Sequence, residues 1–240
     1  MSSLLAEAAP LSCELCAIGR HAFYAPAIAN TPNAITTRRY SQTVLPPRRT
    51  ILQEGEVPKR VYTLYSGWAY RFRTLADGGR QILSFFIPGD FLAIQAVKPT
   101  PLPFSIKALT HVVLCGFDRE ELFEFLMNSE TLRDSFCRDV FAQYDESEQL
   151  LVDIGRRSAV ARVARFLLSL EARLKARGLS RDGAFELPVP QCLIADALGL
   201  TQVHVNRTLG AIRDSGAIEF RRNEMRILGF EELSDLAEGR

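Results

Sequence analysis

The chain has 240 residues, of which 47% are hydrophobic and 24% charged, with a formal net charge of +1. This composition is typical of a globular protein, and the length allows one large domain or two modest ones. No apolar run approaches the roughly 20 residues that span a bilayer, and the first residues lack the basic start of a secretory signal. We therefore expect a cytoplasmic protein without a membrane partner. A slight excess of Lys and Arg after residue 155 permits a nucleic-acid partner for the C-terminal part.

Residues 1–40 are polar, contain the CxxC sequence "CELC" and show little periodicity. Residues 41–128 contain short runs of β-branched and aromatic residues separated by Gly, Asp and Pro, which is typical of an all-β roll or barrel. Within this segment, "ADGG" between two apolar runs predicts a hairpin.

Residues 129–155 predict one long amphipathic helix. Its apolar stripe is longer than a small roll can cover, so we expect it to contact the same helix of a second subunit. The alternative is a helix that folds back on its own domain. The stripe consists of Leu132, Phe136, Val140 and Tyr144, followed by Leu150, Leu151 and Ile154.

Residues 156–240 begin with a helix over 158–177, for which Ser158 is a plausible N-cap. A short strand, "AFELPVP", precedes two short helices that meet at Gly199, where a tight turn favours glycine. The sequence "GAIEFRRNEMRILG" then predicts a two-stranded wing. This order of elements predicts a winged helix-turn-helix that binds DNA, whereas the alternative is a helical hairpin with a solvated polar face.

The second helix of the pair starts after Thr201, a good N-cap. At about 100° per residue, one face is apolar and is expected to pack on the first helix. The opposite face and its flanks carry the side chains that we expect to contact DNA bases near the helix start: Gln202, Val203, His204, Asn206 and Arg207. Thr201 itself is also expected to contact DNA, and the free amides at the helix start suit a phosphate. The wing residues Arg221 and Arg222 are expected to contact further phosphates.

This arrangement resembles the CRP/FNR family of bacterial transcription regulators, and within it the FNR/FixK branch. The motifs that carry the resemblance are "LYSGWAYRF", "FFIPGDFLAI" and "IADALGLTQVHVNRTLGAIRDSGAIE". It implies an α+β fold with an N-terminal cyclic-nucleotide-binding-like β-roll, a long dimerisation helix and a C-terminal winged helix-turn-helix. It also implies a homodimer that binds a palindromic operator in double-stranded DNA and acts on RNA polymerase. The signal implied is oxygen, redox state or a small effector.

The cyclic-AMP-binding members of this family carry an Arg-Ser pair after the Gly-Glu-Leu turn. After Gly89 and Asp90 this chain instead has "VKPTPLPFSIKAL", so a cyclic phosphate would lack its main charge-assisted contact. We therefore do not expect cyclic AMP to bind.

The FNR proteins hold an iron–sulfur cluster on N-terminal cysteines and one cysteine of the roll. The resemblance assigns Cys13, Cys16 and Cys115 to such a set, but the third N-terminal cysteine is replaced by Ala22 or a neighbour. His21 is a rarer fourth ligand. The alternatives are a dithiol or tail remnant for the CxxC and a buried strand cysteine for Cys115.

Other sensors remain open. Cys192 lies near a predicted helix start and is a candidate redox site, because its oxidation would act close to DNA, although packing is the more common role. We expect Cys137 to be interfacial or part of the core. Aromatic side chains of the roll could line a pocket for a small organic effector or haem, with His111 as the weakest candidate haem ligand, or they could simply form the core: Trp68, Tyr70, Phe72, Phe85 and Phe86. A regulator without any cofactor is the remaining alternative.

An enzyme is not expected. A cupin-like metal enzyme needs several converging His and carboxylate ligands, whereas the three histidines of this chain lie in different segments.

The family's recognition helix reads E-x-x-S-R or E-x-x-G-R, where this chain has "VHVNR". The arginine is retained as Arg207, while Val203 replaces a glutamate that accepts from cytosine. We therefore expect the operator to differ from the family's usual one at that base pair.

Overall fold

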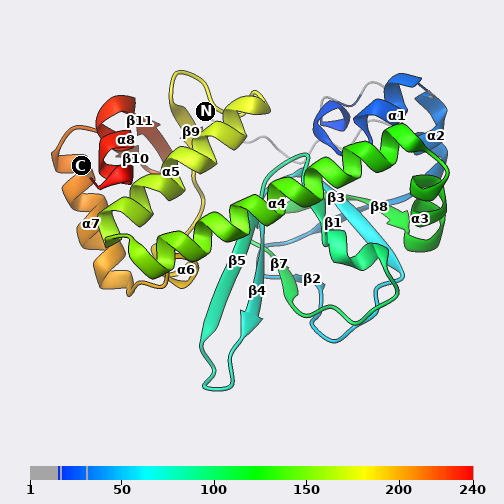
Figure 1. The fold of residues 1–240 in the computed structure, drawn as a ribbon, viewed down its shortest axis with the longest axis horizontal. Helices are drawn as coiled ribbons and strands as arrows, with labels where there is room; N and C mark the ends of the chain where they lie inside the picture. Colours follow the sequence, from blue (N-terminus) through cyan, green and yellow to red (C-terminus); the bar gives the residue numbers. More distant parts are fainter. Residues whose placement is uncertain (1–15, 17, 31, 240) are drawn as a thin grey trace. The chain divides into compact units, whose positions relative to one another are not determined.

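The computed structural model describes residues 16, 18–30 and 32–239, which form two compact units. The first holds the chain up to Gly79 together with Leu83–Tyr144, and the second holds Arg80–Ile82 together with Asp145–Arg240. Figure 1 shows strands and short helices in the first unit and a helical bundle with a small sheet in the second. The expected α+β fold is therefore present.

The first unit is a roll of two antiparallel four-stranded sheets, with strand orders β1-β8-β3-β6 and β2-β7-β4-β5. β8 is flanked by β1 and β3, so that Cys115 of β8 pairs with Gln42 on one side and Thr63 on the other. The strands are β1 (Arg39–Leu45), β2 (Thr50–Leu52), β3 (Arg60–Ser66), β4 (Ala69–Thr74), β5 (Arg80–Phe86), β6 (Phe91–Leu92), β7 (Ser105–Ala108) and β8 (Val112–Asp118).

Alternating apolar side chains of both sheets form one core. Leu64, Leu114 and Phe117 from one sheet and Ile106 from the other are almost completely buried. Between β4 and β5 the chain reverses through the predicted "ADGG" hairpin, where the backbone N–H of Leu75 donates to the carbonyl oxygen of Gly79 at 2.8 Å. A 3-10 turn, η2 (Ile94–Val97), follows β6.

Short helices before β1 were not expected from the sequence. They are η1 (Gly19–His21), α1 (Ala25–Asn30) and α2 (Pro32–Arg38). Phe23 and Ile35 are buried in the roll core, and the ring of Phe23 lies 4.9 Å from that of Phe91 and 5.5 Å from that of Phe136. The prediction of a polar segment without periodicity was wrong here, because the apolar residues are too few per turn for a helical period to stand out.

α3 (Arg119–Met127) is capped by Asp118, whose carboxylate accepts from the backbone N–H of Glu120 and Glu121. α4 (Glu130–Arg156) is a single helix of 27 residues that continues through Gly155, so its bounds lie within one residue of the predicted range.

The apolar residues of α4 lie on two different faces. Leu132 is buried, and Phe136 and Val140 pack against the roll core. The predicted exposed stripe was therefore wrong in its first half, because these residues cover their own domain. The exposed apolar side chains are Phe141 (66% exposed), Tyr144 (58%), Leu151 (72%) and Val152 (50%).

The second unit contains a three-stranded sheet of order β10-β11-β9 beside a group of helices. Leu167, Ile194, Val205, Met225 and Leu233 are buried within it. No helix in the described part of the chain is long and apolar enough to cross a membrane. The elements are α5 (Ala159–Ala176), β9 (Ala184–Glu186), α6 (Gln191–Leu198), α7 (Gln202–Asp214), β10 (Ile218–Arg221), β11 (Glu224–Ile227) and α8 (Phe230–Glu238).

Candidate nucleic-acid interface

The turn between α6 and α7 is formed by residues that suit its backbone. Gly199 ends α6 in the left-handed region, with φ of 63°, where residues with a Cβ are strained. Thr201 begins α7, and its hydroxyl accepts a hydrogen bond from the backbone N–H of His204 at 3.2 Å. The predicted glycine turn and the predicted N-cap are both confirmed. Together they fix where α7 starts and at what angle it leaves α6.

α7 has two chemically different faces. Val205, Thr208, Leu209 and Ile212 are buried, as predicted for the face that packs on α6. The side chains that we predicted to contact DNA are all exposed: Gln202, Val203, His204, Asn206 and Arg207. Val203 is 67% exposed and is the apolar member of an otherwise polar face. The helix thus offers a row of hydrogen-bonding groups around one methyl-bearing side chain.

A contact between the two helices adds one residue that the sequence analysis missed. The side-chain Nδ2 of Asn206 donates to Oε1 of Gln191, the first residue of α6, at 3.1 Å. The two residues lie 15 positions apart in different helices, so the helical period of the sequence does not relate them. The turn at Gly199 brings the start of α6 beside the second turn of α7. A search for polar residues at the start of the first helix could have identified Gln191.

The two arginines of the wing have different surroundings. Arg221 ends β10, and its Nε lies 2.9 Å from Oε1 of Glu219, so part of its charge is already balanced. Arg222 stands in the turn before β11 with φ of 59°, a left-handed conformation that is uncommon for arginine. The two residues were predicted to play equal roles, whereas only Arg222 of the two borders the groove described next.

A groove of about 530 Å³ lies between the wing, the start of α6 and the exposed part of α7. It contains both polar and cationic side chains and is open on one side. Its polar lining consists of Gln191, Asn206, Arg213, Arg222 and Asn223.

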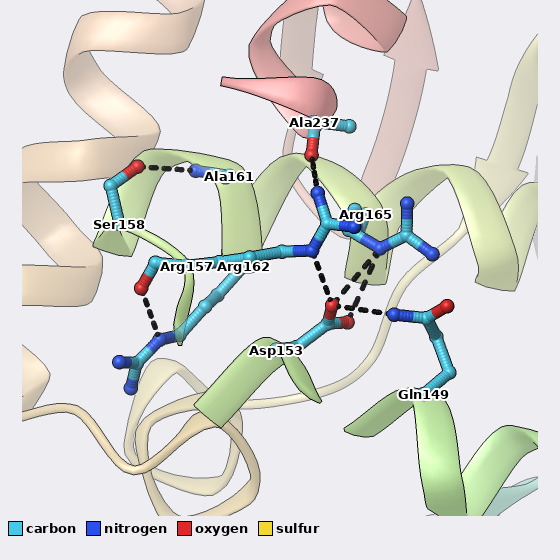
Figure 2. A network of polar contacts seen from close by, with 8 residues as sticks. All are labelled: Gln149, Asp153, Arg157, Ser158, Ala161, Arg162, Arg165 and Ala237. Atoms are coloured by element: carbon cyan, nitrogen blue, oxygen red, sulfur yellow. Dashed lines mark hydrogen bonds and ion pairs between the residues drawn. The ribbon is translucent and has the colours of Figure 1, made fainter. Parts of the chain in front are cut away.

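A buried carboxylate fixes the helices that support this interface (Figure 2). Asp153, near the end of α4, accepts from Nε2 of Gln149 at 2.9 Å and forms ion pairs with Nε of Arg157 at 2.9 Å and of Arg165 at 3.1 Å. An Nη1 of Arg157 also donates to the carbonyl oxygen of Ala237 in α8 at 2.8 Å. A buried carboxylate with several charge-assisted partners is held in one position, and so are the helices that carry the partners.

Arg162 connects the same region to the helix-turn-helix. Its Nε donates to the carbonyl oxygen of Arg157, and its Nη1 donates to the carbonyl oxygen of Leu198 at the end of α6. The carbonyls at a helix end have no partner within the helix, so this arginine satisfies one of them. The turn between α6 and α7 is therefore held by the hydrogen bond from Arg162 at the end of α6 and by the Thr201 cap at the start of α7.

The aromatic residues proposed as an effector pocket are all buried in the roll, apart from the half-buried Phe72: Trp68, Tyr70, Phe85 and Phe86. Side chains alternate between the two faces of a strand, so the consecutive Phe85 and Phe86 point in opposite directions. Phe86 belongs to the roll core, and the rings of Tyr70 and Phe72 contact each other at 5.4 Å. No single cavity can use all these rings, and their role in binding an effector stays a prediction.

The cysteines assigned to a cluster are only partly within the described residues. Cys13 lies outside them, Cys16 is half-buried, and Cys115 is buried in the core of the roll. Over residues 16, 18–30 and 32–239, no group of three or more His, Cys, Asp or Glu side chains is placed to hold a metal ion. The described cysteines of the assigned set, Cys16 and Cys115, supply two of the four thiolates that an iron–sulfur cluster usually takes, so cluster binding stays a prediction. Cys137 is exposed on α4 and so does not belong to the core, and its interfacial position stays a prediction. Cys192 is exposed in the first turn of α6.

Two family models match this chain. The cyclic nucleotide-binding domain covers residues 42–129, and the Crp-like helix-turn-helix domain covers residues 161–236. The first match lies over the roll, and the second lies over α5 to α8.

Curated relatives match over most of their length. The transcriptional activatory protein AadR of Rhodopseudomonas palustris is 32% identical over 196 residues, which is 80% of this chain and 79% of the relative. The transcriptional activator protein FnrA of Stutzerimonas stutzeri is 29% identical over 191 residues, covering 79% of this chain and 78% of the relative. Among solved structures, FixK2 from Bradyrhizobium japonicum has the same fold, with a TM-score of 0.74 at 24% identity over 82% of this chain and 96% of the other.

Proposed function

This chain belongs to the CRP/FNR family of transcription regulators, and we propose that it binds a palindromic operator as a homodimer, with α7 of each copy in the major groove. It is a DNA-binding regulator and not an enzyme, as its relatives are transcriptional activators. The proposal is carried by one observation: the exposed face of α7 concentrates five candidate contact residues beside a wing. Two such helices would lie about one turn of the duplex apart.

Within this proposal, Arg207 is the residue that reads a base most strongly. It is exposed in the second turn of α7, beside Val203 and Asn206. An arginine that contacts O6 and N7 of guanine discriminates by about 1–3 kcal/mol. Val203 contacts a thymine methyl group, where the usual glutamate would accept a hydrogen bond from cytosine.

Phosphates are bound by groups around this reading face. The first amides of α7 point out of the helix start and suit an anion. Arg222 and, with a smaller share because of Glu219, Arg221 add cationic contacts from the wing. These contacts position α7 without specifying a sequence.

The second copy is held by the exposed apolar face of α4. Cys137, Phe141, Tyr144 and Leu151 are exposed and separated by four, three and seven residues, the spacing of the inner positions of a two-stranded coiled coil. An equal patch on an identical helix covers this face with two-fold symmetry, which matches the symmetry of a palindromic operator.

The regulator acts in the cytoplasm on RNA polymerase, as the activator names of its relatives suggest. Its signal remains a prediction with three alternatives: oxygen or redox state sensed at cysteines, including the exposed Cys192, a small effector in the roll, or no cofactor at all. An absorption spectrum of protein purified without oxygen distinguishes a cluster, which absorbs broadly near roughly 400 nm, from haem, which gives a sharp band. A spectrum with neither band favours an organic effector or a regulator without a cofactor.

The test of DNA binding is a selection of duplexes from a random pool, followed by affinity measurements with Arg207→Ala. We expect a palindromic consensus, affinity that falls steeply with salt, and a loss of about 5- to 150-fold for Arg207→Ala on that consensus.

Arg181→Ala is the matched control. It removes the same charge from an exposed position before β9, whose first residue, Ala184, pairs with Arg226 away from the wing tip, so affinity should hardly change. A wild-type protein that selects no sequence, or an Arg207→Ala protein that binds the consensus equally well, would contradict the proposal.

A further inference from the structure

The pair formed by Gln191 and Asn206 lies at the edge of the proposed reading face. Asn206 shares the exposed face of α7 with Val203 and Arg207, and Gln191 begins α6. Nδ2 of Asn206 donates to Oε1 of Gln191 at 3.1 Å, and both side chains line the groove beside the wing. An asparagine that is already hydrogen-bonded to a neighbour has a defined orientation before DNA arrives.

This hydrogen bond decides what Asn206 offers to a base. An asparagine amide has two N–H donors and one carbonyl acceptor. With one N–H directed to Gln191, the groups left for a ligand are one donor and one acceptor, side by side. The major-groove edge of adenine presents an acceptor at N7 and a donor at N6, whereas guanine presents two acceptors at N7 and O6. The amide therefore complements adenine and mismatches guanine.

The start of α6 explains why Gln191 keeps its oxygen toward Asn206. A helix start favours a phosphate, and Arg213 and Arg222 line the same groove. A DNA phosphate bound there would accept from the Nε2 of Gln191, which leaves Oε1 for Asn206. The reversed pair would turn the oxygen of Gln191 toward the phosphate, and two acceptors repel.

We infer that Gln191 and Asn206 act as one specificity device, in which Asn206 selects adenine over guanine and Gln191 is the positioning residue. This inference rests on the proposed entry of α7 into the major groove. It assigns to α6 a role in base selection that Gln191 exerts without touching a base.

The test uses the full-length protein and the duplexes selected above, with each base of one half-site exchanged in turn. Asn206→Ala should remove a preference for adenine at one base pair and leave the other positions unchanged. Gln191→Ala should weaken the same preference by about three- to tenfold, a part of the discrimination that a bidentate contact provides. The double variant should resemble Asn206→Ala, because the two residues act as a unit.

One further variant distinguishes the orientation of Asn206 from phosphate binding by Gln191, and a second variant serves as a control. Gln191→Glu keeps an oxygen toward Asn206 but places a negative charge near the phosphate, so the adenine preference should remain while affinity falls equally for all sequences. Leu228→Ala truncates an exposed side chain of the same unit that does not line the groove, and it should preserve the preference.

The inference is overturned if Asn206→Ala changes no base preference, if the affected base is guanine, or if Gln191→Ala weakens all sequences equally. These results leave DNA binding through Arg207 intact. A wild-type protein without any sequence preference would instead refute the proposed function itself.

Discussion

The roll and the winged-helix unit use their unusual residues in opposite ways. In the winged-helix unit, the residues with proposed roles are exposed on α7, where no requirement of packing explains Val203 or Asn206. In the roll, the aromatic residues and Cys115 that could sense a signal are buried, where packing alone explains them. Surface chemistry can therefore be read as function, whereas the same residue types in a core cannot. The two units should respond differently to mutation.

The largest expected effect is a loss of stability in the roll. Phe117→Ala removes a fully buried ring from β8 that lies 5.5 Å from the ring of Tyr24. It should lower the free energy of unfolding by about 3–5 kcal/mol, because a cavity is left. Trp68, the single tryptophan, lies in the roll, so its fluorescence during urea denaturation reports this unit. The half-exposed Phe220 of the winged-helix unit provides the control, and Phe220→Ala should leave the Trp68 transition unchanged.

A smaller effect is expected on assembly. Leu151→Arg places a charge on the exposed face of α4 proposed to hold the second copy, and should raise the dissociation constant of the dimer by at least about 100-fold. Sedimentation velocity over a concentration series measures it. Val44→Arg places the same charge on another exposed apolar residue, in β1, and should leave the association unchanged. A Leu151→Arg protein that sediments like the wild type would place the dimer contact elsewhere.

The smallest effect on stability is expected for Val203→Glu, because the side chain is exposed and the helix start tolerates an acidic residue. The free energy of unfolding should change by less than about 0.5 kcal/mol. The base preference should nevertheless change at one base pair, from thymine toward cytosine on the strand contacted, in a competition between duplexes. If stability falls and the preference stays, Val203 supports the helix instead of facing DNA.

The winged-helix unit could be predicted from the sequence because its signals are local. Gly199 in the turn, Thr201 as N-cap and the period of Val205, Thr208 and Ile212 each lie within a few residues of the feature they determine. The hydrogen bond from Asn206 to Gln191 could not be read in this way, since it depends on how two helices cross.

The roll and α4 were harder to predict because their contacts join distant segments. Phe23 and Ile35 are buried by strands that follow them in the chain, so the short helices that carry them have no period of their own. On α4, Leu132 and Phe141 are equally apolar, yet only the first faces the roll. Composition shows that such a helix must be covered, but the three-dimensional arrangement decides which residues its own domain covers.

The contact between Arg157 and Ala237 has a practical consequence for handling this protein. The carbonyl oxygen that accepts from Arg157 belongs to Ala237, near the end of the short helix α8 (Figure 2). A tag or label inserted directly after α8, or a protease that cuts there, acts next to the group that helps to position Arg157 beside Asp153. Labels for purification and surface attachment therefore belong away from α8, and mass spectrometry is a sensible check that this helix is intact before any binding measurement.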